Sequence, residues 1–385
     1  MKKLFLALAL SWVAMAVTTA SAADIPVKVS FQMMSDSAVN AVTALDGEQP
    51  VEPLKISIGD AVNLRFSGYA QVDYDYINEH GVTSNDFNIR RVILMAEAQF
   101  TPKLTAFVMV DAANSTYAKH LQEFYIQYAF VPQFKLRIGQ FKQPFMLENI
   151  ISPRLLGTLS MNESTRYMAG IAGDPLYGNM AGRDLGLMAS GDLFRAPDGH
   201  YWLNYSAGIF NGAGLNVRDN NRHKDFIAML NVRPVEGLTV STSCIVGKGR
   251  ARNDSPFNTV EEGEEYTRNR WSAGLEYKRG RVNLRGEWAW GKDGKVNSRG
   301  GYVELALRTL PKLDLVLDFD HLNTNTTLSR AEQEMLPRPT STCSYLVGLQ
   351  YWVYKRCRVA SQYVFRDRRT GPDMHEWITQ VQVSF

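Results

Sequence analysis

Basic side chains recur at alternate positions in several short stretches of the 385-residue chain. In residues 281–290, Arg281, Asn283, Arg285 and Glu287 share one parity, and the other parity is largely apolar. An arginine fork holds carboxylate or phosphate oxygens and keeps its charge at neutral pH. This pattern would allow anions to bind along the solvent-facing side of a β-strand. The candidates are Lys142, taken from a loop, and nine residues selected by parity: Arg91, Lys135, Arg137, Lys278, Arg281, Arg285, Arg308, Arg356 and Arg358.

Alternation with period two places one face of a strand against an apolar medium and the other against water. Tight turns and long polar stretches also alternate between the segments, as in a transmembrane barrel with short periplasmic turns and long outer loops. The sequence therefore predicts an all-β fold, a closed antiparallel transmembrane β-barrel of sixteen strands. The expected strands are 64–76, 87–100, 104–113, 120–131, 133–141, 183–194, 200–210, 222–233, 237–247, 268–279, 281–291, 300–310, 312–322, 342–354, 356–366 and 375–385.

A soluble β-sandwich or propeller is the alternative fold, because a second sheet could also bury the apolar parity. Aromatic residues near the strand ends favour the barrel, since Trp and Tyr gather at both membrane interfaces. These aromatics are Tyr74, Tyr76, Trp271, Tyr277, Trp288, Trp290, Tyr351, Tyr363 and Trp377.

Charge on the wet parity is balanced. Arg65 and Arg366 raise the basic set selected by parity to eleven, against twelve acidic side chains. The basic residues gather toward the periplasmic half of the lumen, on strands five, ten to twelve and fifteen, so we expect a basic wall there. The alternative is that charges on adjacent strands neutralise each other. The acidic set is Asp73, Asp75, Glu97, Asp111, Glu123, Asp184, Glu276, Glu287, Glu304, Asp314, Asp318 and Asp320.

The N-terminus has the order of a cleaved secretory signal. Lys2 and Lys3 precede an apolar run over 4–17, and small residues follow at 20–22. A retained membrane helix is the weaker reading, because the run is short for a bilayer. We expect a signal peptide over 1–22, a periplasmic segment or linker over 23–63, and an outer-membrane barrel over 64–385.

Composition narrows the partners. The net charge of +3, from 42 basic and 39 acidic residues, gives no reason to expect nucleic-acid binding. Three cysteines do not make a disulfide framework, and Cys343 and Cys357 are expected at opposite ends of neighbouring strands. No cofactor or metal motif is present, since the acidic cluster at 261–265 lacks EF-hand spacing.

Two other functions stay open from the sequence. An outer-membrane hydrolase would need a base beside a nucleophile, and His321 near Asn323 is the least poor candidate. A barrel that mainly binds partners could use the long loops 248–267 and 323–340. We favour a channel and expect no enzymatic activity.

Two stretches resemble the phosphate-selective porin O and P family. They are FNIRRVILMAEAQFTPKLTAFVMVD, residues 87–111, and LRIGQFKQPFMLEN, residues 136–149. The terminal Phe385 is similar to the aromatic signal read by the barrel-assembly machinery. The resemblance implies a sixteen-stranded channel in the bacterial outer membrane, embedded in its lipid, often homotrimeric, whose loop after the fifth strand folds into the lumen. In this chain that loop is 142–182.

The resulting expectation is a diffusion channel for small hydrophilic solutes, with anions such as phosphate among them. Within the inward loop, Lys142, Arg154 and Arg166 are expected to narrow and charge the passage, or else to lie at the outer surface as ordinary loop residues. Selectivity in such a channel depends on pore width and on fixed charge at the narrowest point.

Overall fold

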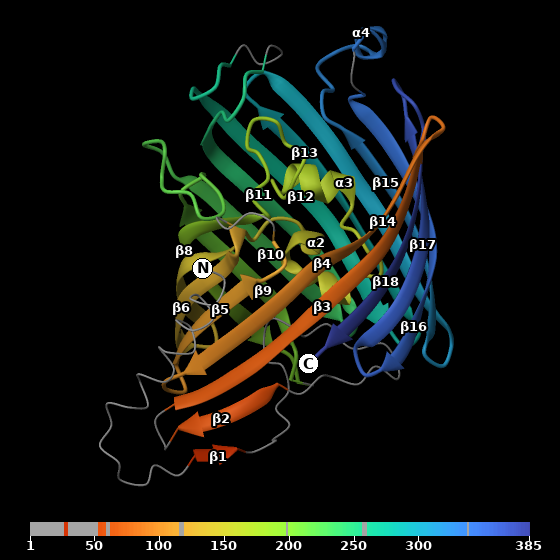
Figure 1. The fold of residues 1–385 in the computed structure, drawn as a ribbon. Coiled ribbons are helices and arrows are strands. Elements are labelled where there is room, and N and C mark those ends of the chain that lie inside the picture. The colour runs from red at the N-terminus through yellow and green to blue at the C-terminus, as the bar shows by residue number, and fades with distance from the viewer. Residues whose placement is uncertain are drawn as a thin grey trace, which may run out of the picture.

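The computed structural model describes residues 27–29, 53–58, 62–114, 119–197, 199–255, 260–336 and 339–385. Its core is an antiparallel barrel in which each strand pairs with its neighbours in the chain. The barrel closes because the last strand, β18, pairs with β3 (Met374 with Glu79, through to Ser384 with Tyr69). Sixteen strands, β3 to β18, form this closed wall (Figure 1). The predicted fold class is confirmed.

Each predicted segment corresponds to one strand of the wall. The strands are β3 Val62–Glu79, β4 Val82–Gln99, β5 Leu104–Asp111, β6 Leu121–Val131, β7 Phe134–Lys142, β8 Arg183–Arg195, β9 Tyr201–Phe210, β10 Asp225–Val235, β11 Leu238–Arg250, β12 Glu265–Arg279, β13 Val282–Asp293, β14 Val296–Leu310, β15 Leu313–Asn323, β16 Ser341–Tyr354, β17 Cys357–Arg368 and β18 Met374–Ser384.

Two further strands precede the barrel. β2 (Leu54–Ile58) pairs with the first residues of β3, and β1 (Val27–Val29) pairs with β2. Part of the expected linker 23–63 is therefore sheet, which the irregular alternation of that region did not indicate. The signal peptide predicted over 1–22 lies outside the described residues and stays a prediction.

The wall is polar inside and apolar outside. On β15, Leu317 and Phe319 are 40% and 39% exposed, whereas Asp318 and Asp320 are 8% and 1% exposed. A soluble protein buries the opposite set of side chains. Exposed Val, Leu, Tyr and Trp residues on the remaining strands continue the apolar band, which is the surface that a membrane barrel presents to lipid. No helix among the described residues is long and apolar enough to cross a bilayer.

The two rims of the barrel differ. At the rim that we call the short-turn end, two-residue turns such as 280–281 join successive strands. At the opposite, long-loop end, polar loops include 211–224 and 324–340, the latter carrying helix α4 (Arg330–Glu334). The connection between β3 and β4 at this end is also tight, because these strands extend to 18 residues each. All three cysteines are free.

Candidate functional site

The connection between β7 and β8 runs inside the barrel. This inward segment, residues 143–182, contains helix α2 (Leu147–Ile150), the 3-10 turn η2 (Pro153–Leu155) and helix α3 (Glu163–Met168). Both helices lie within the ring of strands in Figure 1. Hydrogen bonds tie the segment to side chains on β11, β13, β14, β15, β17 and β18. It therefore covers the inner face of that half of the wall.

Wall carboxylates hold the inward segment by its backbone. Each accepts a main-chain N–H that the short helices and turns leave without a helical partner. A carboxylate that accepts backbone N–H groups forms charge-assisted hydrogen bonds, which are stronger than neutral ones. The pairs are Leu147 N–H with Glu287 (2.8 Å), Thr158 N–H with Glu304 (3.2 Å) and Glu163 N–H with Asp320 (3.0 Å).

Arg270 on β12 fastens the C-terminal end of α3. Its Nη1 donates to the carbonyl oxygens of Tyr167 (2.8 Å) and Met168 (2.6 Å), and its Nη2 lies 2.6 Å from both Asp174 and Asp293. The side chain is fully buried. Asp174 belongs to the inward segment and Asp293 to the wall, so one guanidinium joins the two parts.

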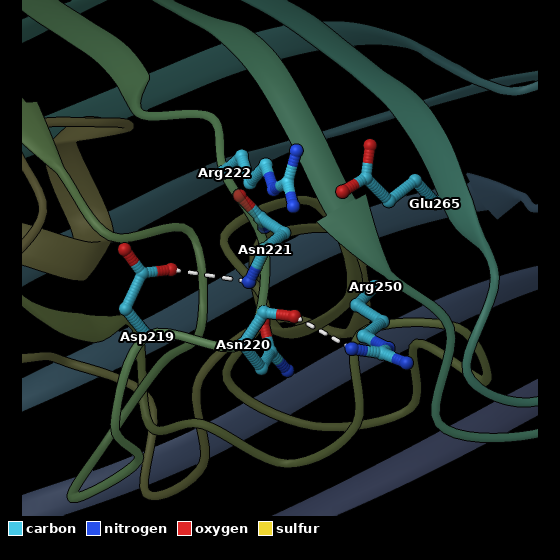
Figure 2. Close-up of a pocket in the computed structure, with 6 residues that line it drawn as sticks. All are labelled: Asp219, Asn220, Asn221, Arg222, Arg250 and Glu265. Atoms are coloured by element: carbon cyan, nitrogen blue, oxygen red, sulfur yellow. Dashed lines mark hydrogen bonds between the residues drawn. The ribbon is translucent and has the colours of Figure 1, made fainter.

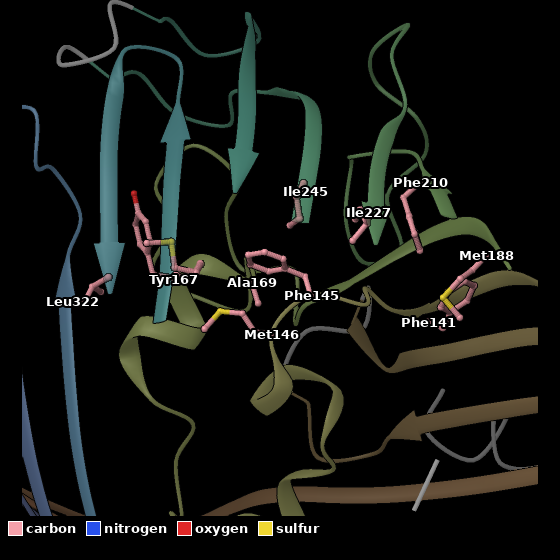
Figure 3. Close-up of a cluster of buried hydrophobic side chains, with 12 residues drawn as sticks. Phe141, Phe145, Met146, Tyr167, Ala169, Met188, Phe210, Ile227, Ile245 and Leu322 are labelled. Carbon is pink, nitrogen blue, oxygen red and sulfur yellow. The ribbon is translucent and has the colours of Figure 1, made fainter. Parts of the chain in front are cut away.

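Apolar packing completes the attachment. Phe145, Met146 and Tyr167 of the inward segment join a buried cluster with Ile245 of β11 and Leu322 of β15 (Figure 3). A buried aromatic or Met side chain of this kind contributes roughly 1.5–3 kcal/mol. The segment is thus held by packing as well as by hydrogen bonds.

Lys142 is the last residue of β7, at the start of the turn into the lumen. Its Nζ donates to the carbonyl oxygens of Asn149 (2.6 Å) and Ile151 (2.8 Å) at the end of α2. A cation at a helix C-terminus is favourable because the last carbonyls carry partial negative charge. Lys142 therefore positions the inward segment.

The inward segment also carries cations of its own. Arg166 on α3 is exposed, and Arg154 in η2 is half-buried, with its guanidinium carbon 5.9 Å from the Tyr69 ring centre. From the sequence, either a lumenal position or a position at the outer surface was possible for these two arginines. They belong to a segment that lies inside the barrel.

Several predicted lumenal cations form ion pairs with acids on adjacent strands. Three residues of the expected basic wall, Lys135, Arg285 and Arg308, are neutralised in this way, as in the alternative that the sequence left open. The pairs are Lys135 with Asp192 (2.9 Å), Arg285 with Glu304 (2.6 Å), Arg65 with Glu97 (3.2 Å), Arg308 with Asp314, and Arg366 with Glu376 (2.5 Å).

Three other predicted cations donate to amide or carbonyl oxygens of described residues. Arg91 donates to Gln71 (2.9 Å) and Arg137 donates to Gln127 (2.8 and 3.0 Å). Arg358 is buried and donates to the Leu156 carbonyl of the inward segment (2.8 Å). Of the remaining three predicted residues, Lys278 and Arg356 are buried in the wall, and Arg281 is exposed at the turn 280–281.

Four arginines of the site are not in the predicted set. Arg268 and Arg270 share the parity of Glu276 and Lys278 on β12, so the alternation contained the signal for them. Arg183 bonds Glu123 (2.9 Å) at the start of β8, where the chain leaves the inward segment. Arg90 contacts Asp73 and Ser160, and a break in strand register hides it from any parity rule.

A shallow hollow lies at the mouth of the long-loop end. Loop 211–224 and the ends of β11 and β12 line it, and Figure 2 shows that Arg222 and Arg250 share this hollow with the acidic residues Asp219 and Glu265. Burial opposes ionisation of Asp219, but hydrogen bonds from Lys224 and backbone N–H groups outweigh it and lower its pKa. Its mixed charges suit a solvated rim more than a specific anion site.

His321, the candidate base for a hydrolase, contacts a thiol and an indole ring. Its Nδ1 lies 3.4 Å from the Cys343 sulfur, and its ring stacks on Trp288. Among the described residues, no hydrogen bond joins His321 to a serine. Nor do these residues contain a group of three or more His, Cys, Asp or Glu side chains placed to hold a metal ion.

A closed sixteen-stranded barrel with a polar lumen and an inward connection after its fifth strand has the fold of an outer-membrane porin. The solved structures agree. The anion-selective porin from Comamonas acidovorans superposes with a TM-score of 0.61 over 84% of this chain and 100% of that one, at 10% identity. OprB of Pseudomonas putida gives 0.59 over 84% and 94%, at 10% identity, and the outer-membrane channel DcaP of Acinetobacter baumannii gives 0.57 over 84% and 98%, at 13% identity.

The match to a sequence family covers less of the chain than the structural matches do. The model of the family described as phosphate-selective porin O and P matches residues 62–189, from β3 through the inward segment into β8. The predicted resemblance to that family is confirmed over this range, which includes both stretches that carry it. No curated protein sequence matches the chain.

Proposed function

We propose that the chain is an outer-membrane diffusion channel that favours small anions, with the inward segment as its constriction. The observation that carries this proposal is an asymmetry in how the lumenal charges are satisfied. Acids that form no ion pair with any described cation, such as Glu287 and Asp320, accept hydrogen bonds from the backbone of the inward segment. Cations that no described carboxylate pairs with, such as the partly exposed Arg91 and the exposed Arg166, stay accessible from the lumen.

This asymmetry matters more than the count of charges. A carboxylate that is buried behind the inward segment and bonded to N–H groups is shielded from a passing ion. An arginine that faces the passage offers its fork to solute oxygens. The expected result is a passage whose exposed surface is positive at the inward segment, although basic and acidic lumenal residues are nearly equal in number.

The matched family and the Comamonas porin support a preference for anions, because they are described as phosphate-selective and anion-selective.

We place the short-turn end in the periplasm and the long-loop end outside, as in other barrels of this kind. Lipid surrounds the exposed apolar band, and Phe385 is read by the assembly machinery after cleavage of the signal peptide. A homotrimer is the proposed assembly, because a solved neighbour, OmpT of Vibrio cholerae, is described in a trimer form.

Planar bilayers test the proposal directly. The reversal potential is measured for the purified chain in a gradient of potassium chloride, and then with phosphate replacing chloride. If the channel prefers anions, the reversal potential has the sign of the chloride equilibrium potential. A potential set by potassium would refute anion preference, and absence of any current would refute the channel.

A further inference from the structure

Three aromatic side chains form a lumenal patch on β5, β6 and β7, which we call the aromatic shelf: Phe107, Tyr125 and Phe141. Phe107 and Tyr125 are cross-strand partners whose rings stack at 5.1 Å with a 26° interplanar angle. Phe141 meets Tyr125 edge to face at 6.0 Å. Phe107 and Tyr125 are only half-buried. A polar lumen thus contains an accessible aromatic surface.

The backbone is shaped to accommodate this shelf. Tyr125 lies opposite Gly139 of β7, where φ is +138°. A Cβ atom at Gly139 would lie 2.2 Å from the Phe124 carbonyl oxygen and 2.6 Å from the Tyr125 Cα. Only glycine fits, so the strands approach closely here.

Arg137 is fixed against the shelf with its charge unneutralised. Its guanidinium carbon lies 4.0 Å from the Tyr125 ring centre and 5.3 Å from that of Phe141. Nε and Nη2 both donate to Gln127 Oε1, and within the described part of the chain no carboxylate pairs with Arg137. Lys135, two residues earlier, is paired with Asp192 at 2.9 Å. Nη1 of Arg137 is left for a solute.

We propose that the aromatic shelf and Arg137 form a binding subsite for aromatic carboxylates. The carboxylate binds Arg137, and the planar ring of the solute packs on Phe107. A compact inorganic anion gains only the charge interaction, whereas an aromatic acid gains both. The inference rests on the proposed anion channel and narrows its solute class.

Two monocarboxylates of similar size separate charge from aromaticity: benzoate and cyclohexanecarboxylate. Each is added to the full-length channel in a planar bilayer that carries chloride current, and the concentration that halves the current is measured. We expect benzoate to act at about tenfold lower concentration than cyclohexanecarboxylate. Phe107→Leu should bring the two acids to similar potency, and Arg137→Gln should weaken both.

Phe124→Leu is the matched control, because Phe124 adjoins Tyr125 in sequence but is 49% exposed on the outer face. It should keep the difference between the two acids. If Phe107→Leu fails to insert, Phe107→Met removes the ring at closer to the original volume. Equal potency of the acids on the unaltered channel, or a difference that survives loss of the Phe107 ring, would overturn the subsite and leave the anion channel standing. Absence of anion current in the unaltered chain overturns both.

Discussion

Arg90 and Arg91 are adjacent in sequence, yet both side chains enter the lumen. Strand register explains this: Gln71 pairs with Arg91 and Val72 with Ile89, so Arg90 is the extra residue of a β-bulge. Bulges turn successive side chains to the same face. Arg91 then donates to Gln71, and Arg90 contacts Asp73 and Ser160 of the inward segment. The bulge adds a second arginine to this face of the wall, which is paired with Asp73 and reaches Ser160 of the inward segment.

Charge reversal at Arg166 should change ion preference without disturbing the wall, because this side chain is exposed on the inward segment. Arg166→Glu replaces a cation in the passage with an anion. We expect the ratio of chloride to potassium permeability to fall about fivefold. Reversal potentials in a salt gradient measure it. Arg330→Glu, the same change on exposed α4 at the outer rim, should have little effect, and an equal effect of both variants would contradict a constriction at Arg166.

Removing a carboxylate that holds the inward segment should loosen it. Asp320→Ala deletes the acceptor for the backbone N–H groups of Glu163 and Ser164. Leaving two buried donors without a partner costs roughly 1–3 kcal/mol each, so we expect noisier single-channel currents and a larger mean conductance. Asp320→Asn keeps one oxygen acceptor and should have a smaller effect. Unchanged currents in Asp320→Ala would show that packing alone fixes the segment.

Arg270 should be a major determinant of stability. Arg270→Leu leaves Asp174 and Asp293 buried with no guanidinium between them. Removing one partner of a buried pair costs about 3–5 kcal/mol. Urea unfolding of the barrel in detergent micelles measures the loss through the transition midpoint. Arg281→Leu, at an exposed turn, should shift the midpoint by under about 0.5 kcal/mol.

Glu148 should make the inward segment sensitive to pH. It lies on α2 and not on a barrel strand, and burial raises its pKa to about 7 although Arg285 opposes the shift. An acid whose pKa is raised on folding binds its proton more tightly in the folded state. The stability it contributes is therefore complete below its unfolded value near 4.5 and is lost as pH rises through about 7.

Unfolding midpoints measured at pH 5 and pH 8 test this prediction. A shift of about 2.5 pKa units corresponds to roughly 3 kcal/mol, lost toward pH 8. Glu148→Gln keeps the shape of the side chain and should lower the pH dependence. Equal pH dependence in the variant and the unaltered chain would assign the effect to other groups.

Strand number and order could be predicted from the sequence because alternation is a local signal. In residues 281–290, for example, the polar and apolar parities are visible in the sequence itself. The parity rule failed at Arg90, because a bulge inserts one residue and reverses the faces beyond it. It also could not find β2, a strand of five residues in which short length masks the alternation.

The chemistry of the lumen was harder to predict than its lining. The charged residues at lumen-facing positions could be counted from the sequence. Which of the acids accept hydrogen bonds from backbone N–H groups depends on the position of the inward segment, residues 143–182. Glu287 and Asp320 meet donors that are 140 and 157 positions away in the chain. The exposure of Arg137 beside the paired Lys135 depends equally on Tyr125 and Asp192, which lie on different neighbouring strands.

The pairing of β18 with β3 joins the last and the first strands of the barrel wall. Across this seam Gln380 donates to Asp73, 307 positions away in the chain. Until those two edges meet, each exposes a row of unpaired peptide groups that hydrocarbon cannot satisfy. Deleting β18, the final eleven-residue strand, would therefore leave an open sheet with two unpaired edges that is prone to aggregate. Insertion into a bilayer thus depends on closure of the whole barrel.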